Sequence, residues 1–155
     1  MANPWCWIGA GALVIVLGAL GLPYWRRWRK QQSLMRAMLQ FRQQREHLEA
    51  KFLQHASQRG KPRGLLWSEC EWMDAVQFAR DRQSGTLTAF VGITVKFAAV
   101  QGGEMEDVAA VDDPKEAVAV FYYCHHRWVT EGQALFNLNP TDALAQLSRQ
   151  FEPTC

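Results

Sequence analysis

TLTAFVGITVKFAAV, residues 86–100, carries the clearest strand pattern in the chain. Every second side chain from Leu87 to Ala99 is apolar. The alternate positions are mostly polar, namely Thr86, Thr88, Thr94 and Lys96. A period of two over this length predicts an antiparallel strand with one face against a core and the other in water. The chain is therefore expected to contain an antiparallel sheet.

Further strands are expected on both sides of this one. Alternation predicts strands at Leu66–Trp72 and Val76–Arg80, followed by the turn segment Asp81–Gly85. Residues 101–116 begin with glycines and are acidic, which indicates an exposed loop. A last long strand is predicted over Ala117–Thr130. The sheet should thus have about four antiparallel strands.

A long amphipathic helix is predicted over residues 32–57, where no Gly or Pro interrupts a run of good helix formers. Its positions spaced four and three apart form one stripe, of which five in seven are apolar. The stripe consists of Leu34, Met38, Phe41, Arg45, Leu48, Phe52 and His55. We expect it to pack on the chain's own sheet. The alternative is a short parallel coiled coil, with Arg45 at a core position.

A short C-terminal helix is predicted after Asn139, which suits the N-cap, and Pro140, which suits the first helical position. Its buried stripe is expected to be Ala143, Leu144, Leu147 and Phe151. The fold class is therefore α+β: a long helix, an antiparallel sheet and a short helix. In element order, residues 32–151 resemble the cystatin-like and NTF2-like folds. That resemblance implies a curved sheet wrapped on a helix, and it implies no function.

An apolar span precedes this domain. Residues 5–25, WCWIGAGALVIVLGALGLPYW, contain no charge and have the length of a membrane-spanning helix. A cleaved signal peptide is the rival interpretation, but the four-residue tail 1–4 lacks Lys and Arg and no A-x-A site follows the span. Gly11 and Gly18 lie on one face, which leaves self-association through this helix open. We expect a retained single-pass anchor.

Aromatic and basic side chains flank the span, as at a membrane interface. The interface residues are Trp5, Trp7, Tyr24, Trp25, Arg26, Arg27, Trp28, Arg29 and Lys30. The basic segment 26–31 predicts that the N-terminus is outside, that the domain is cytoplasmic, and that anionic lipid binds here. A basic hinge, 58–64, separates the long helix from residues 65–155, the sheet domain with its C-terminal helix.

The charge is divided unevenly along the chain. Residues 1–64 hold 11 Lys and Arg against 2 Asp and Glu, whereas residues 65–155 hold 6 against 13. The overall net charge of +2 therefore conceals a basic first part and an acidic domain. An acidic domain repels phosphate, so no nucleic-acid partner is expected. The expected partners are the bilayer and another membrane protein or a second copy of this chain.

One set of side chains is a candidate for chemistry: Cys70, Cys124 and His126. On a continuous strand Cys124 and His126 would share a face, and strand pairing would be needed to bring Cys70 beside them. The spacing of zinc motifs is absent, so a buried thiol near a histidine is the preferred interpretation, with no metal and no cofactor. In the cytoplasm both thiols would stay reduced.

The sequence identifies no reaction. It contains no G-x-S-x-G and no phosphate-cradling glycine loop. We therefore expect a non-catalytic, membrane-tethered interaction or accessory protein. The alternative is a small-molecule-binding or enzymatic domain with an aromatic cleft, formed by Trp67, Trp72, Tyr122, Tyr123 and Trp128.

Overall fold

The computed structural model describes residues 25, 28–29, 31–59, 65–103 and 113–154, and it divides the chain into two compact units, 1–43 and 44–155. In the first unit, residues 31–43 are helical, and a turn at Gln44 ends that helix. Within the described ranges, no helix is both long enough and apolar enough to cross a membrane. Residues 5–24 of the expected span lie outside those ranges, so the anchor stays a prediction.

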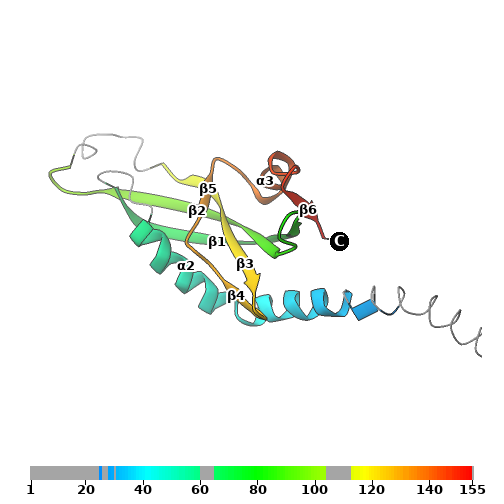
Figure 1. The fold of residues 1–155 in the computed structure, drawn as a ribbon. Helices are drawn as coiled ribbons and strands as arrows, with labels where there is room; N and C mark the ends of the chain where they lie inside the picture. The colour runs from blue at the N-terminus through cyan, green and yellow to red at the C-terminus, as the bar shows by residue number, and fades with distance from the viewer. Residues whose placement is uncertain (1–24, 26–27, 30, 60–64, 104–112, 155) are drawn as a thin grey trace, which may run out of the picture. The chain divides into compact units, whose positions relative to one another are not determined.

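The second unit is an α+β domain built on one antiparallel sheet, as the sequence predicted (Figure 1). Its strands are β1 (Leu65–Asp81), β2 (Leu87–Ala99), β3 (Lys115–Cys124), β4 (Arg127–Val129), β5 (Ala134–Phe136) and β6 (Phe151–Pro153). The strand order is β4-β3-β2-β1-β6. β5 pairs with Ala117–Ala119 in the first part of β3, whereas β4 pairs with the end of β3. The described part of the chain thus contains six strands rather than about four.

The two strands expected before the Asp81–Gly85 turn are one strand, β1. The register shifts between Trp67 and Glu69, and again between Trp72 and Val76. At the second shift, residues 73–75 lie opposite the single residue Gly92, whose Cβ position comes within 2.9 Å of the Met73 sulfur. These β-bulges interrupt the alternation without ending the strand, and for this reason the sequence pattern suggested a break.

The last strand was predicted wrongly as one piece. It is a hairpin in which β3 ends at Cys124 and β4 begins at Arg127, and these two residues are paired. The two loop residues, His125 and His126, both have positive φ, 51° and 61°. Two-residue hairpin loops with positive φ at both positions usually contain Asn or Gly. His-His gives no such signal, so the turn was missed.

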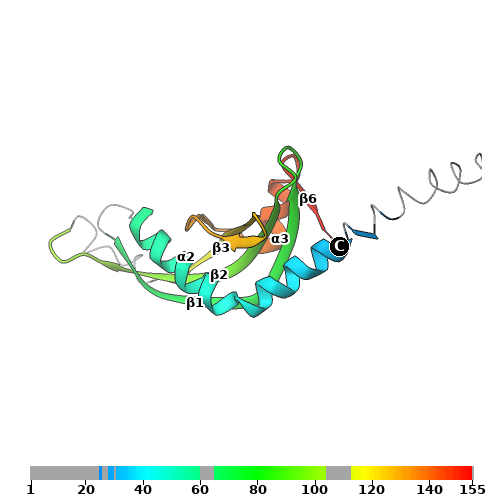
Figure 2. The same cartoon turned by 60° about the horizontal axis from the view of Figure 1, so that its bottom comes forward.

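Helix α2 (Arg45–Arg59) covers one face of the sheet (Figure 2). Its apolar stripe is buried in this unit, with Leu48 and Phe52 at most 1% exposed. The Phe52 ring packs edge-on against Trp67 and Trp72 of β1, at centroid distances of 6.1 and 5.5 Å. The expectation that this stripe packs on the chain's own sheet is therefore confirmed for α2.

A second core lies on the opposite face, under α3 (Pro140–Gln146) and β6. The helix begins as predicted: the Asn139 side chain accepts a hydrogen bond from the Asp142 backbone N–H, and Pro140 follows the cap. Phe151, however, belongs to β6 instead of the helix, and its ring meets Phe90 of β2 at 5.2 Å. The first half of β2 is consequently buried on both faces, contrary to the expected polar face.

Candidate functional site

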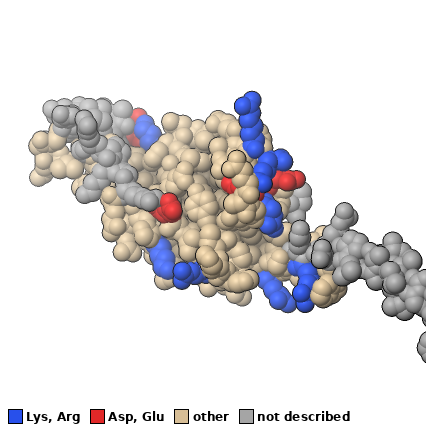
Figure 3. Space-filling model, in the orientation of Figure 1, with Lys and Arg blue, Asp and Glu red and all other residues tan. Residues whose placement is uncertain are grey.

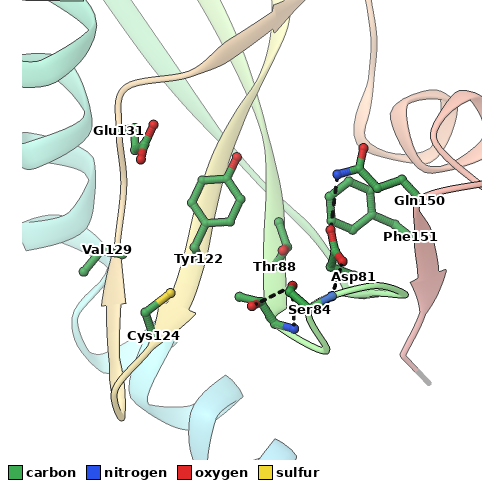
Figure 4. A pocket seen from close by; sticks show the side chains of 10 residues that line it. Asp81, Ser84, Thr88, Tyr122, Cys124, Val129, Glu131, Gln150 and Phe151 are labelled. Carbon is green, nitrogen blue, oxygen red and sulfur yellow. Dashed lines mark hydrogen bonds between the residues drawn. The ribbon is translucent and has the colours of Figure 1, made fainter.

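A pocket of about 300 Å³ opens on the α3 side of the sheet, at the end next to the β1–β2 turn (Figure 4). Its floor is a row of residues paired across neighbouring strands: Thr88 of β2 stands between Ala79 of β1 and Tyr122 of β3. The lining residues are Asp81, Ser84, Thr86, Thr88, Tyr122, Cys124, Val129, Glu131, Gln150 and Phe151. These residues come from five strands, the β1–β2 turn and the segments beside β4 and β6, so only the folded sheet assembles the pocket.

Asp81 shapes the rim of the pocket at the turn. One of its carboxylate oxygens accepts hydrogen bonds from the backbone N–H groups of Gln83 and Ser84, each at 2.8 Å. The other oxygen accepts one from Gln150 at 3.2 Å. These hydrogen bonds lower the pKa of the Asp81 carboxyl, because they stabilise its charged form. The bond from the Ser84 backbone has the largest effect. Asp81 is thus a fixed negative charge at this edge.

Tyr122 forms the opposite wall. Its hydroxyl lies 2.8 Å from the Gln133 side-chain oxygen, to which it donates a hydrogen bond. Burial raises the pKa of Tyr122, and the negative charges of Glu131 and Asp81 raise it further. The phenol is therefore neutral, and it lies in the negative potential of two carboxylates.

Thr88 is the unusual member of the set. Its side chain is completely buried, and its Oγ1 has no hydrogen-bond partner among the described residues. A buried hydroxyl without a partner costs about 1–3 kcal/mol. Figure 4 shows this side chain between those of Tyr122 and Asp81, on the pocket side of the sheet. The pocket floor therefore offers an unused hydrogen-bonding group.

The structure does not bring Cys70, Cys124 and His126 together. Cys70 pairs with Val95 on the face covered by α2, whereas Cys124 lines the pocket on the other face, at the far end of β3. His126 is exposed in the hairpin loop and does not continue the strand face of Cys124. Across the described ranges, no group of three or more His, Cys, Asp or Glu side chains is arranged to hold a metal ion.

Cys70 is a poor nucleophile. Burial raises the pKa of its thiol to about 11, and the Glu49 carboxylate adds to this effect. Because the thiolate is the reactive form, Cys70 is almost entirely unreactive near pH 7. Cys70 and Cys124 are both free thiols.

The five large aromatic residues do not form a common cleft. Trp67 and Trp72 pack on Phe52 beneath α2, and Tyr123 packs on Trp128 at 5.2 Å. Only Tyr122 lines the pocket. Thr86 and Thr88 also line the pocket, although the alternation of the strand predicted that they face solvent.

Among the expected membrane-interface residues, the structure describes Trp25, Trp28 and Arg29. Trp25 and Trp28 are 48% and 51% exposed, and the Arg29 guanidinium lies over the Trp25 ring, 4.0 Å from its centroid. Trp5, Trp7, Tyr24, Arg26, Arg27 and Lys30 lie outside the described residues.

The outer edge of β1 is the other notable surface. Its neighbours are β2 on one side and β6 on the other, but β6 reaches only Ala79–Asp81. No described strand pairs with the outer edge from Leu65 to Gln77. Glu69, Glu71 and Asp74 are exposed along this length. On the face seen in Figure 3, acidic and basic side chains of the described residues occur in small groups separated by uncharged surface.

The sequence matches no protein-family model, and no curated protein and no solved structure matches it. The likeness to cystatin-like and NTF2-like folds is thus one of element order only.

Proposed function

We propose that this chain is a non-catalytic, membrane-tethered interaction protein whose sheet binds an extended segment of a partner at the free edge of β1. The observation that carries this proposal is the long edge of β1 between Leu65 and Gln77, with which none of the described strands pairs. An exposed strand edge presents unpaired N–H and C=O groups, and a partner chain can add a strand to it.

The chemistry of this edge favours a basic partner. Glu69 is paired with Lys96 at 2.7 Å, and Asp74 lies 3.5 Å from Arg45, so each of these carboxylates already has one cation nearby. Glu71 is exposed, and no ion pair involving it is found among the described residues. A segment with Lys or Arg at alternate positions would place its cations along this acidic row.

The bulges limit which partner can pair here. Arg45 of α2 donates a hydrogen bond to the Met73 carbonyl, and this contact occupies the edge at the second bulge. A bulge also twists the strand and disturbs a regular ladder, which is a common protection against indiscriminate edge pairing. The straight part of the edge, Glu69–Trp72, therefore offers the best docking length.

Support for the tether comes from the segment before the domain. Its exposed side chains include Trp25, Trp28, Met35 and Leu39, with Met35 and Leu39 at 66% and 57% exposure. Exposed aromatic and apolar residues beside Arg29 are typical of a helix at a membrane surface. The expected span at 5–25 would then hold the acidic domain near the cytoplasmic membrane surface.

The surroundings of the two candidate nucleophiles, Cys70 and Cys124, support the non-catalytic part of the proposal. The Cys70 thiol is held in its protonated form by burial, and Cys124 shares no strand face with His126. Neither arrangement pairs a nucleophile with a general base, as covalent catalysis requires.

Site-specific photocrosslinking in cells tests this proposal. A photoreactive amino acid at Glu71 is expected to give one discrete crosslinked product with a second polypeptide. The matched control is the same amino acid at Gln146, an exposed position on α3, away from the β1 edge. No product from Glu71, or equal products from both positions, would contradict edge docking.

A further inference from the structure

The pocket beside the β1–β2 turn has a composition that selects for charge. Its described lining residues include Asp81 and Glu131, which are carboxylates, but no Lys, Arg or His. Two arginines lie near the pocket, Arg80 at the end of β1 and Arg82 in the β1–β2 turn. Arg80 donates a hydrogen bond to the Gly85 carbonyl, and Arg82 donates one to the Ser148 carbonyl. A negatively charged pocket with no lining cation attracts cationic ligands and repels anionic ones.

The unused hydroxyl of Thr88 is an independent indication of a ligand. In the described part of the chain, Thr88 Oγ1 has no hydrogen-bond partner although the residue is fully buried, and it lies on the pocket floor beside the Tyr122 ring. Native proteins leave few buried polar groups unpaired, so an unpaired one needs a physical explanation, and a bound molecule that completes its hydrogen bond is one such explanation. The oxygen of a hydroxyl can accept a hydrogen bond from an N–H donor.

The lining also has an apolar part. Phe151 is 6% exposed and packs edge-on against Phe90, and Val129 lies on the β4 side of the pocket. The volume of about 300 Å³ suits a ligand of one ring or a short chain. A ligand that matches both parts has a small apolar body and one positively charged nitrogen.

We propose that this pocket binds a small primary amine, whose ammonium group donates a hydrogen bond to Thr88 Oγ1 in the negative potential of Glu131 and Asp81, while its apolar part lies against the rings of Tyr122 and Phe151. Asp81, fixed by the turn, adds negative potential without changing its own hydrogen bonds. Tyr122 remains bonded to Gln133 and supplies the face of its ring. This inference goes beyond the proposed edge docking and does not depend on it.

Three probes with the same ring and different charges test the proposal on the full-length protein in detergent: benzylamine, benzyl alcohol and benzoate. Binding is measured as the saturable rise in the temperature of unfolding, followed by tryptophan fluorescence. We expect benzylamine to bind at least tenfold more tightly than benzyl alcohol, and benzoate to leave the unfolding temperature unchanged. No saturable rise with benzylamine, or tighter binding of benzoate, would overturn the proposal.

Thr88→Val separates a ligand-binding hydroxyl from a merely unsatisfied one. The substitution keeps the shape of the side chain and removes the unpaired hydroxyl, so the ligand-free protein should become more stable. We expect its affinity for benzylamine to fall about tenfold, the effect of one hydrogen bond to a charged group. Thr88→Val that binds benzylamine as tightly as the natural chain would overturn the assignment.

Two more variants keep the test decisive if Thr88→Val does not fold. Thr88→Ser retains the hydroxyl and should retain benzylamine binding, and Glu131→Gln should weaken it severalfold. The control is Glu71→Gln, an exposed carboxylate of β1 that does not line the pocket, which should leave the affinity unchanged. Equal losses in Glu131→Gln and Glu71→Gln would show that only the net charge of the domain attracts the amine, and would overturn the proposed site.

Discussion

Gly132 lies against the backbone of α2 beside Ala56. A Cβ atom at Gly132 would collide with the Ala56 nitrogen and would come within 2.6 Å of the His55 carbonyl carbon. Gly132 also has a φ of +72°, a backbone conformation that residues with a side chain rarely adopt. The loop that follows β4 therefore packs directly against the backbone of α2, and this contact fixes the position of the loop on the helix.

Gly132→Ala should destabilise the protein strongly, by about 3 kcal/mol or more, because it combines a backbone clash with an unfavourable φ. Urea unfolding of the full-length protein in detergent measures the loss. The matched control is Gly85→Ala: Gly85 has a similar φ of +71°, but nothing lies within 4 Å of its Cβ position. The control should cost only about 1 kcal/mol. Equal losses in the two variants would show that the close approach to α2 has no energetic importance.

The packing of α2 on the sheet predicts the effect of a charge in its stripe. Leu48→Asp should unfold the domain, because an unpaired buried carboxylate costs several kcal/mol against a total stability of about 5–15 kcal/mol. Ala50→Asp, at an exposed position of the same helix, is the control and should cost no more than about 1 kcal/mol, mostly from the lower helix propensity of Asp. If α2 were instead a dimer seam, Leu48→Asp would yield a folded monomer, which size-exclusion chromatography would reveal.

The His125-His126 loop predicts a stabilising substitution. Both residues have positive φ, a conformation that Asn and Gly adopt with less strain than histidine. Replacing the pair by Asn-Gly should raise the stability by about 1 kcal/mol. Thermal unfolding measures the change. A loss of stability would mean that histidine side-chain contacts outweigh the backbone strain.

The raised pKa of Cys70 predicts its reactivity with pH. Since the folded thiol titrates near 11 instead of 9.0, alkylation of Cys70 by iodoacetamide should be very slow at pH 8 and should accelerate up to about pH 11. The same shift means that Cys70 favours the folded state fully below pH 9 and progressively less between pH 9 and 11. Glu49→Gln should move the alkylation profile to lower pH. Mass spectrometry follows Cys70 separately from the other cysteines, and a profile centred near pH 9 would contradict the burial of this thiol.

Topology is predicted by the basic segment 26–31. Residues 26–155 should lie in the cytoplasm, so a membrane-impermeant maleimide added to intact cells should label Cys155 only after lysis. Cys155→Ser identifies the labelled band. Strong labelling before lysis would place the domain outside the cell.

The sequence alone determined the elements whose signals are local. The alternation from Leu87 to Ala99 gave the central strand, and the Asn139-Pro140 pair gave the start of α3. The helical stripe placed Leu48 and Phe52 on the buried side of α2. Each signal depends on neighbours within a few residues, so a short window of sequence contains it.

Only the tertiary structure decided what depends on distant segments. Thr88 and Phe90 are buried because α3 and β6, some fifty residues later, cover the face that the local pattern assigned to water. Period-two alternation reports that one face is apolar, but it does not report whether another element covers the second face.

The candidate site shows the same division. Cys70 and Cys124 lie on opposite faces of the sheet because strand pairing and β-bulges set the register. A register shift of one residue moves every side chain of a strand to the other face. The pocket gathers Asp81, Thr88, Tyr122 and Glu131 from separate strands and turns. No spacing in the sequence could indicate this set, because its members become neighbours only when the sheet forms.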